Sequence, residues 1–350
     1  MSQVPQQEHK SASFSKLRQR RTYLFLSLIA VIIVGGVIGI EALRRLNARQ
    51  SVLGPDLYPE AAAERARAAF PRQLRDAGGR VVTIKARPVR IVSQTLSTDE
   101  ILLAICTPER IVGFSPLALD PRYSNVVAEA RSDGSPTFEN AEQILQVEPD
   151  LIFVASYSRP EIVEQLQAAG ATVFRFNDFV TVEDIERNIR IVGYATGEDQ
   201  RAEALVAQME HDLSVIRARV PAGGTRPRVL SFSADGYTAG SVTLFDDIVR
   251  RAGAINVAAE QGLEGYPRIS AEQVAAWQPD FIIAGAEADR FEETRRRLLQ
   301  NPAVAATNAA RANRIIIIDN RYFLTVSQYV VHTLGMVVDG LYASQPERAQ

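Results

Sequence analysis

The chain has 350 residues, of which 46% are apolar and 23% charged, and its formal net charge is −2. This composition excludes an intrinsically disordered chain, a collagen-like chain and a polytopic membrane protein. Residues 1–50 hold eight basic and two acidic side chains, so residues 51–350 hold 31 basic and 39 acidic ones, a net charge of −8. An acidic body argues against nucleic acid as the main partner. The single cysteine, Cys106, excludes an intrachain disulfide and a multi-cysteine metal or redox site.

An uncharged stretch rich in Leu, Ile and Val covers residues 22–40. At 1.5 Å per residue, a helix of this length spans the hydrocarbon core of a bilayer, about 30 Å. Five basic residues precede it and three follow, which favours a cytoplasmic N-terminus and a body outside the membrane. A cleaved signal peptide is the alternative, but the apolar run is long for one and no A-x-A-like site follows. We therefore expect a cytoplasmic tail over 1–21, a transmembrane anchor over 22–40 and an Ala- and Arg-rich helical stalk over 41–75.

After the stalk, short β-branched runs alternate with segments at helical spacing. Strands are predicted over 81–84, 90–93, 110–113, 151–155 and 172–176, and helices over 98–105, 140–147 and 160–169. Alternating β and α units of this kind predict a parallel sheet that is covered by helices.

An internal repeat divides the body into two copies. The sequence of residues 140–152 recurs at 270–282, that of 90–93 recurs at 228–231, and that of 99–102 is similar to 246–249. The order is kept and the offsets differ only by the length of a loop. We therefore predict an N-terminal α/β lobe over 76–197 and a C-terminal α/β lobe over 221–350.

Between the two copies, residues 198–220 carry apolar side chains on one helical face and end at Pro221. They predict a long linking helix. The expected fold is an α/β protein with two Rossmann-like lobes joined by one long helix, preceded by an N-terminal transmembrane helix.

Motifs for catalysis are missing from the sequence. It has no GxxxxGK[ST] phosphate loop, no GxGxxG after 90–93 or 228–231, and no G-x-S-x-G turn. The three histidines, His9, His211 and His332, have no metal-ligand spacing. These absences disfavour a nucleotide-dependent α/β enzyme. We expect no catalytic residues, no metal site and no cofactor.

In open α/β sheets, ligands bind beyond the carboxyl ends of the strands. The loops predicted there contain many aromatic and arginine side chains, namely Tyr123, Tyr157, Tyr237, Tyr266, Tyr322, Phe323, Arg159, Arg268, Arg290 and Arg321. Aromatic side chains with a few fixed positive charges suit a bulky, partly apolar ligand that can carry negative charge.

Four motifs in order resemble the iron-chelate and vitamin B12 class of ABC-importer solute-binding proteins. They are Asp76-x-x-Gly-Arg-x-Val-Thr-Ile, Pro88-x-Arg-Ile-Val-Ser, Asn140-x-Glu-x-Ile-x5-Asp-Leu-Ile and Ser270-x-Glu-Gln-Val, and the resemblance covers roughly residues 70–345. It implies two α/β lobes joined by one long helix, a ligand in the cleft between them, and docking on a membrane permease whose ATPases are separate chains.

The resemblance also implies roles for particular residues. Glu142 and Glu272, the third residue of each repeat copy, match the glutamates that meet arginines of the permease. Asn140-x-x-Gln and Ser270-x-x-Gln look like capping boxes, so each glutamate would also lie in a first helical turn, where a negative charge favours the helix dipole. The expected ligand-binding residues are Tyr157, Arg159, Tyr237, Tyr266, Tyr322 and Arg321.

The sequence therefore predicts a single-pass protein of the bacterial cell membrane, with its body on the periplasmic or extracellular side. It would bind an iron chelate, such as a siderophore or heme, or a corrinoid, and deliver it to an ABC permease. Its expected partners are that permease, the separate ATPase subunits and the lipid bilayer around residues 22–40, with no nucleic acid. The alternative is a tethered ligand sensor on the same fold that passes cleft closure to a partner.

Overall fold

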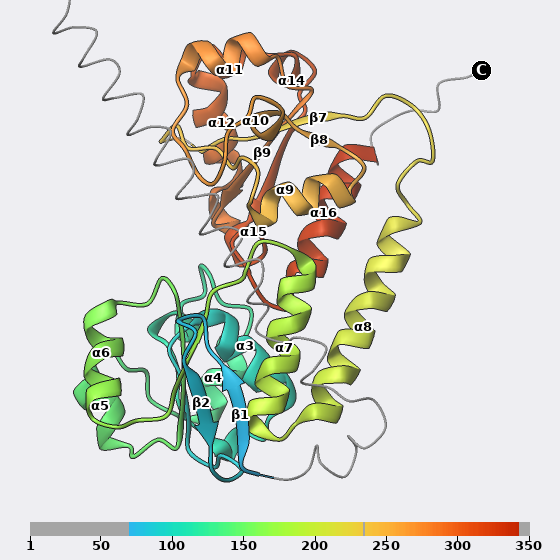
Figure 1. The fold of residues 1–350 in the computed structure, drawn as a ribbon. Coiled ribbons are helices and arrows are strands. Elements are labelled where there is room, and N and C mark those ends of the chain that lie inside the picture. Colours follow the sequence, from blue (N-terminus) through green and yellow to red (C-terminus); the bar gives the residue numbers. More distant parts are fainter. Residues whose placement is uncertain (1–69, 234, 343–350) are drawn as a thin grey trace, which may run out of the picture. The chain divides into compact units, whose positions relative to one another are not determined.

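The computed structural model describes residues 70–233 and 235–342 (Figure 1). The predicted tail, the anchor and residues 41–69 of the stalk lie outside these ranges. Among the helices of the described residues, none has both the length and the apolar character needed to cross a membrane.

The last residues of the predicted helical stalk are a strand, which corrects that prediction. β1 (Arg72–Arg75) pairs antiparallel with β2 (Val81–Ile84). Leu74 and Arg72 point inward and are 1% and 2% exposed. The Arg72 guanidinium donates to the Asp199 carboxylate at 2.8 Å. The alternation of buried and exposed side chains along Arg72–Arg75 has the period of a strand, which fits its pairing with β2.

The first large sheet contains four parallel strands in the order β4 (Ile111–Gly113), β3 (Ile91–Ser93), β5 (Leu151–Ala155) and β6 (Val173–Phe176). Its helices are α3 (Leu96–Ile105), α4 (Val127–Asp133), α5 (Ala141–Gln146), α6 (Pro160–Ala168) and α7 (Val182–Thr196), with short 3-10 turns at Pro108–Arg110 and Pro116–Leu119. The predicted strands and helices of this region are confirmed, with ends shifted by one or two residues. We call the described residues 70–197 the N-lobe.

The second large sheet is also parallel, in the order β10 (Ile315–Asp319), β9 (Phe281–Ala286), β7 (Arg228–Ser231) and β8 (Ile255–Asn256). Its helices are α9 (Leu244–Arg251), α10 (Val257–Glu260), α11 (Ala271–Trp277), α12 (Phe291–Gln300), α13 (Pro302–Ala305), α14 (Asn308–Arg311), α15 (Asn320–Phe323) and α16 (Val330–Tyr342), with a 3-10 turn at Ala288–Arg290. We call the described residues from 226 to 342 the C-lobe.

Both sheets have the same topology. Counted along the chain within each four-stranded sheet, the spatial order is second, first, third and fourth strand. Ile91 pairs with Leu151 in the first sheet and Val229 pairs with Phe281 in the second, so the two copies of the repeat form separate sheets.

The repeated residues hold each sheet to the helix that precedes its third strand. The Asp150 carboxylate accepts the backbone N–H of Arg90 at 3.1 Å, and Asp280 accepts that of Arg228 at 2.9 Å. The side chains of the same two arginines donate to carbonyls at the ends of α5 and α11, at 2.9 and 2.7 Å. Because each motif residue satisfies backbone groups that would otherwise lack a partner, this part of the repeat is structural.

One repeat match needs a correction of register. Thr95 caps α3 and Thr243 caps α9, each accepting the N–H of the residue three positions later. These caps differ by 148 positions in the numbering, so Asp99 corresponds to Asp247 and not to Asp246 as the sequence match implied. The capping threonine marks where each helix begins, so it aligns the two helices more reliably than a pair of acidic residues in the sequence does.

The lobes are linked by α8 (Asp199–Arg217), a helix of 19 residues and about 28 Å. It is shorter than the segment predicted to be helical. Ala202, Val206 and Met209 form its buried face, and it packs against α7 and α16 (Figure 1). At its start, Glu198 is 8% exposed and pairs with Arg110 at 2.5 Å.

Candidate functional site

The two lobes contact each other through segments that follow the carboxyl ends of their strands. Three hydrogen bonds illustrate this: Asn125 Nδ2 to the Arg321 carbonyl at 2.9 Å, Ser97 Oγ to the Val326 carbonyl at 2.8 Å, and the Val182 N–H to the Asp247 carboxylate at 3.0 Å. The carboxyl edges of the two sheets therefore face each other, and this is where α/β sheets bind ligands.

Exposed apolar side chains gather at these edges. Among the described residues, eleven large apolar or aromatic side chains are exposed. Leu117, Tyr157, Tyr237 and Leu324 follow strand ends, and Tyr266 lies in a segment that bridges to the loop after β7. These five are 45% to 67% exposed. Several exposed apolar side chains at one edge are a better indication of a ligand site than single ones scattered on a surface.

Tyr157 follows β5 in the N-lobe. Its ring is 62% exposed and lies 5.7 Å from the ring of Phe179. Its hydroxyl interacts with Thr95, the buried cap of α3. Desolvation of the phenol oxygen raises the pKa of Tyr157 to about 12, and the nearby Asp99 carboxyl adds to the rise while the bond to Thr95 opposes it. At neutral pH this phenol is uncharged.

Tyr237 and Tyr266 belong to neighbouring segments of the C-lobe. Tyr237 pairs with Arg268 in an isolated antiparallel bridge, and the Arg268 guanidinium lies 5.5 Å from the centre of the Tyr237 ring. The Arg268 guanidinium also donates to the Asp235 carbonyl at 3.0 Å. This part of the C-lobe therefore holds two phenol rings and one cation that is held in place by a backbone carbonyl.

The remaining predicted ligand residues have protein partners. Arg321 forms a two-pronged ion pair with Asp319, its Nη2 lying 2.8 Å from Oδ2, and the hydrogen bond from Arg321 lowers the pKa of that carboxyl against the effect of burial. Tyr322 lies between the guanidinium of Arg321 and the ring of His332, 5.5 Å away. Arg159 donates to the carbonyl of Glu139. The structure thus places Tyr237 and Tyr266 on neighbouring segments, while Arg321 pairs with Asp319 and Arg159 donates to a backbone carbonyl.

Sequence reasoning missed Leu117, Phe179 and Leu324. Each of them lies in a connecting segment shortly after a strand. An apolar residue in such a segment is the sequence signal that could have identified it. Leu324 also lines a cavity of about 300 Å³ at the strand ends of the C-lobe, together with Ser233, Asp235, Gly285 and Asn320.

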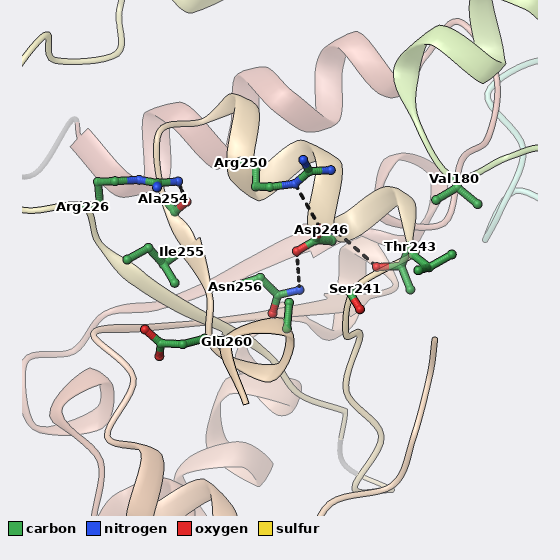
Figure 2. Close-up of a pocket in the computed structure, with 12 residues that line it drawn as sticks. Val180, Arg226, Ser241, Thr243, Asp246, Arg250, Ala254, Ile255, Asn256 and Glu260 are labelled. Atoms are coloured by element: carbon green, nitrogen blue, oxygen red, sulfur yellow. Dashed lines mark hydrogen bonds and ion pairs between the residues drawn. The ribbon is translucent and has the colours of Figure 1, made fainter. Parts of the chain in front are cut away.

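A second cavity, of about 520 Å³, lies beside α9 and β8 (Figure 2). Its charged and polar groups satisfy one another. Asp246 pairs with Arg250 at 3.0 Å and accepts a hydrogen bond from Asn256 at 3.1 Å, and Glu260 pairs with Arg228 at 2.6 Å. Because these groups already have partners, this cavity is a weaker candidate than the facing strand ends.

Glu142 and Glu272 are both exposed and lie in the first turns of α5 and α11. Ser270 and Gln273 form a complete capping box, as predicted. The box predicted at α5 is only half formed, because Gln143 Oε1 accepts the N–H of Glu139 and not that of Asn140. The N–H donors at the two helix starts are therefore satisfied in different ways.

We expect Ser270→Ala to lower the free energy of unfolding by about 1 kcal/mol, because it removes the oxygen that accepts the Gln273 N–H. It also removes the hydroxyl that lies 3.2 Å from the Glu272 carboxylate. Chemical denaturation measures the change. Asn140→Ala is the matched variant at α5, and an unchanged stability for both variants would contradict a role for the caps.

Within the part of the chain that the structure describes, no group of three or more His, Cys, Asp and Glu side chains is placed to hold a metal ion. Two α/β lobes that each contain a parallel sheet, with exposed aromatic side chains at the facing strand ends, are typical of the class of two-lobed solute-binding proteins. The sequence model of the family described as periplasmic binding protein matches residues 91–322, and the chain belongs to this family. This confirms the resemblance to the iron-chelate and vitamin B12 class.

Individual relatives agree with that assignment. A cobalamin-binding protein of Halobacterium salinarum is 29% identical over 272 residues, which cover 75% of this chain and 73% of the relative. An uncharacterized ABC transporter substrate-binding lipoprotein of Bacillus subtilis, YvrC, is 29% identical over 64% of this chain and 73% of its own. The solved structure of the periplasmic heme-binding protein RhuT from Roseiflexus sp. RS-1, in its apo form, is 29% identical, covers 73% of this chain and 98% of its own, and has a TM-score of 0.63. These relatives are binding proteins.

Proposed function

We propose that the chain is the solute-binding protein of an ABC importer and that it binds heme, another iron chelate or a corrinoid between its lobes. The observation that carries the proposal is the group of exposed aromatic and apolar side chains at the facing strand ends, Leu117, Tyr157, Tyr237, Tyr266 and Leu324. The names of the relatives, which include cobalamin-binding and heme-binding proteins, support this class of ligand.

The chemistry of the site suits a large ring system. The flat faces of tyrosine rings gain most from a ligand that covers them with apolar surface, as a porphyrin or corrin does. Arg268, stacked on Tyr237, would offer its charge to an acidic group at the ring edge. Tyr157 is an uncharged phenol in the free protein and would donate a hydrogen bond, or lose its proton if it bound a ferric ion of the cargo.

The proposal also includes a membrane anchor over residues 22–40 and a body on the outer side of the cell membrane. The uncharged run and the excess of basic residues before it support the anchor. The two exposed glutamates at repeated positions, Glu142 and Glu272, would dock on basic side chains of the permease.

Titration of the full chain in detergent with hemin, cobalamin and a ferric siderophore tests the function. We expect at least one probe to bind and to raise the unfolding temperature, since a ligand at 100 times its Kd stabilises the folded state by about 2.7 kcal/mol. Absence of binding by all three probes would contradict the proposal.

For the probe that binds, we expect Tyr157→Ala to weaken the affinity by about tenfold or more, because an aromatic anchor in a binding site contributes about 2 kcal/mol. Val215→Ala is the control. Val215 is 53% exposed on α8, away from the strand ends, and its loss should leave the affinity unchanged. Equal affinities of wild type and Tyr157→Ala would place the ligand elsewhere.

A further inference from the structure

A buried carboxylate in the N-lobe bonds to both lobes. Glu100 lies on α3 and is 1% exposed. Its Oε1 accepts the backbone N–H and the side-chain Nδ2 of Asn125, both at 3.0 Å. Its Oε2 accepts the hydroxyls of Ser327 and, at 3.4 Å, Thr325 in the C-lobe. One carboxylate thus connects α3, the loop after β4 and the chain after β10.

Neighbouring bonds hold the same C-lobe segment, residues 321–328, against the N-lobe. Gln328 Nε2 donates to the Glu100 carbonyl at 3.0 Å, and Ser97 donates to the Val326 carbonyl at 2.8 Å. Asn125 Nδ2 also donates to the carbonyl of Arg321 at 2.9 Å. The segment begins with Arg321 and Tyr322 and includes exposed Leu324, so it belongs to the candidate ligand site.

Glu100 forms no ion pair with any described residue. The titratable groups that face it are Asp99, adjacent on α3, and Tyr329 of the C-lobe, and neither is a cation. Asn125 Oδ1 and Gln328 Oε1 are buried nearby and accept no hydrogen bond from the described residues. A carboxylate that is buried without a cation lowers the stability of the fold. Its four hydrogen bonds, however, define where the groups around it lie.

We propose that Glu100 is a positioning residue that sets the placement of the two lobes and holds segment 321–328 at the ligand site. The first part concerns the chain without ligand. The second part rests on the proposed function.

Two substitutions at Glu100 distinguish the effect of its hydrogen-bond geometry from the effect of lost packing. Glu100→Ala removes both acceptor oxygens and leaves the Asn125 N–H and the two hydroxyls without their partner. Glu100→Gln keeps one acceptor for Asn125, and its amide N–H groups can donate to the hydroxyls of Ser327 and Thr325, which also accept. We therefore expect the glutamine variant to retain the lobe placement that the alanine variant loses.

The decisive measurement is the distance between the lobes in the full chain without ligand. Spin labels on Glu164→Cys of α6 and Arg296→Cys of α12, both exposed positions, report it by pulsed dipolar spectroscopy in a Cys106→Ala background. We expect Glu100→Ala to broaden the distance distribution and Glu100→Gln to keep that of the wild type. Asp150→Ala is the matched control, because Asp150 also accepts backbone N–H groups in the N-lobe but has no C-lobe partner. An unchanged distribution in Glu100→Ala, or an equal broadening in Asp150→Ala, would overturn the proposal.

Binding of hemin and cobalamin tests the second part. We expect Glu100→Ala to weaken the affinity of the bound probe by about tenfold, because hydrogen bonds to charged groups are among the stronger ones. Glu100→Gln should weaken it by less than about threefold, because the glutamine can still bond to Asn125 and the two hydroxyls. Equal affinities in all variants would refute the effect on the site. If the wild type binds none of hemin, cobalamin and the ferric siderophore, the proposed function fails, while the distance measurement still decides the role of Glu100. Should Glu100→Ala not fold, Ser327→Ala removes one of the two C-lobe hydroxyls that donate to Glu100 and is expected to broaden the distribution by itself.

Discussion

Replacing both Glu142 and Glu272 by alanine is expected to reduce uptake through the importer by about tenfold or more, because charge pairs at the rim of an interface govern its encounter rate and register. Ligand affinity should not change, since both carboxylates lie in first turns of short helices that carry none of the exposed aromatic side chains of the site. Each single variant should have an intermediate effect, because the two lobes would dock with one contact each.

The measurement is uptake of the bound probe by cells that depend on this chain, beside a titration of the purified variant. A control pair matches the chemistry: Glu161 and Glu293 are also exposed, lie in first helical turns, and belong to one lobe each. Their double alanine variant should import normally. Normal uptake by the Glu142 and Glu272 double variant at unchanged ligand affinity would contradict the docking role. If the role is correct, higher salt should weaken docking on the permease.

The free energy of unfolding should depend on pH through Asp99. This side chain is fully buried, accepts hydrogen bonds from the backbone and hydroxyl of Ser115, and has the adjacent Glu100 as its charged neighbour. Burial raises the pKa of Asp99 from 3.8 to about 8. In the folded chain it therefore keeps its proton to a higher pH than in the unfolded chain.

The sign of the effect follows from this difference. Between about pH 4 and about pH 8 the unfolded chain has released the proton and the folded chain holds it, so stability falls as pH rises, by up to about 1.4 kcal/mol per pH unit. Asp99→Asn, which resembles the protonated acid and cannot titrate, removes this contribution. The stability of the variant relative to wild type should increase from pH 5 to pH 8 and then level off.

Denaturant titrations at pH 5, 6, 7, 8 and 9 measure the difference. Asp120→Asn serves as control, because the hydrogen bond from Arg122 lowers the pKa of Asp120, so its contribution is complete above pH 5 and the difference should be constant there. A constant difference for Asp99→Asn over the same range would show that Asp99 titrates at its ordinary value.

The sequence by itself determined the fold class and its duplication. The β-branched runs at 91–93 and 151–155 predicted buried parallel strands, and the Pro-Asp pairs ending in Asp150 and Asp280 marked the repeat, because both are visible as patterns of the sequence itself. The start of α11 was predictable for the same reason, since its capping box involves only Ser270 and Gln273. Tyr157 and Tyr237 could be placed at strand ends because loops that follow parallel strands share one edge of the sheet.

Only the tertiary structure decided features that depend on partners distant in sequence. Arg72 lies in a strand that pairs with β2 and forms an ion pair with Asp199, 127 positions away. Glu100 bonds to Ser327, 227 positions away. Local patterns report the preferences of neighbouring residues, whereas the orientation of a charged side chain depends on which groups the fold brings within hydrogen-bond distance.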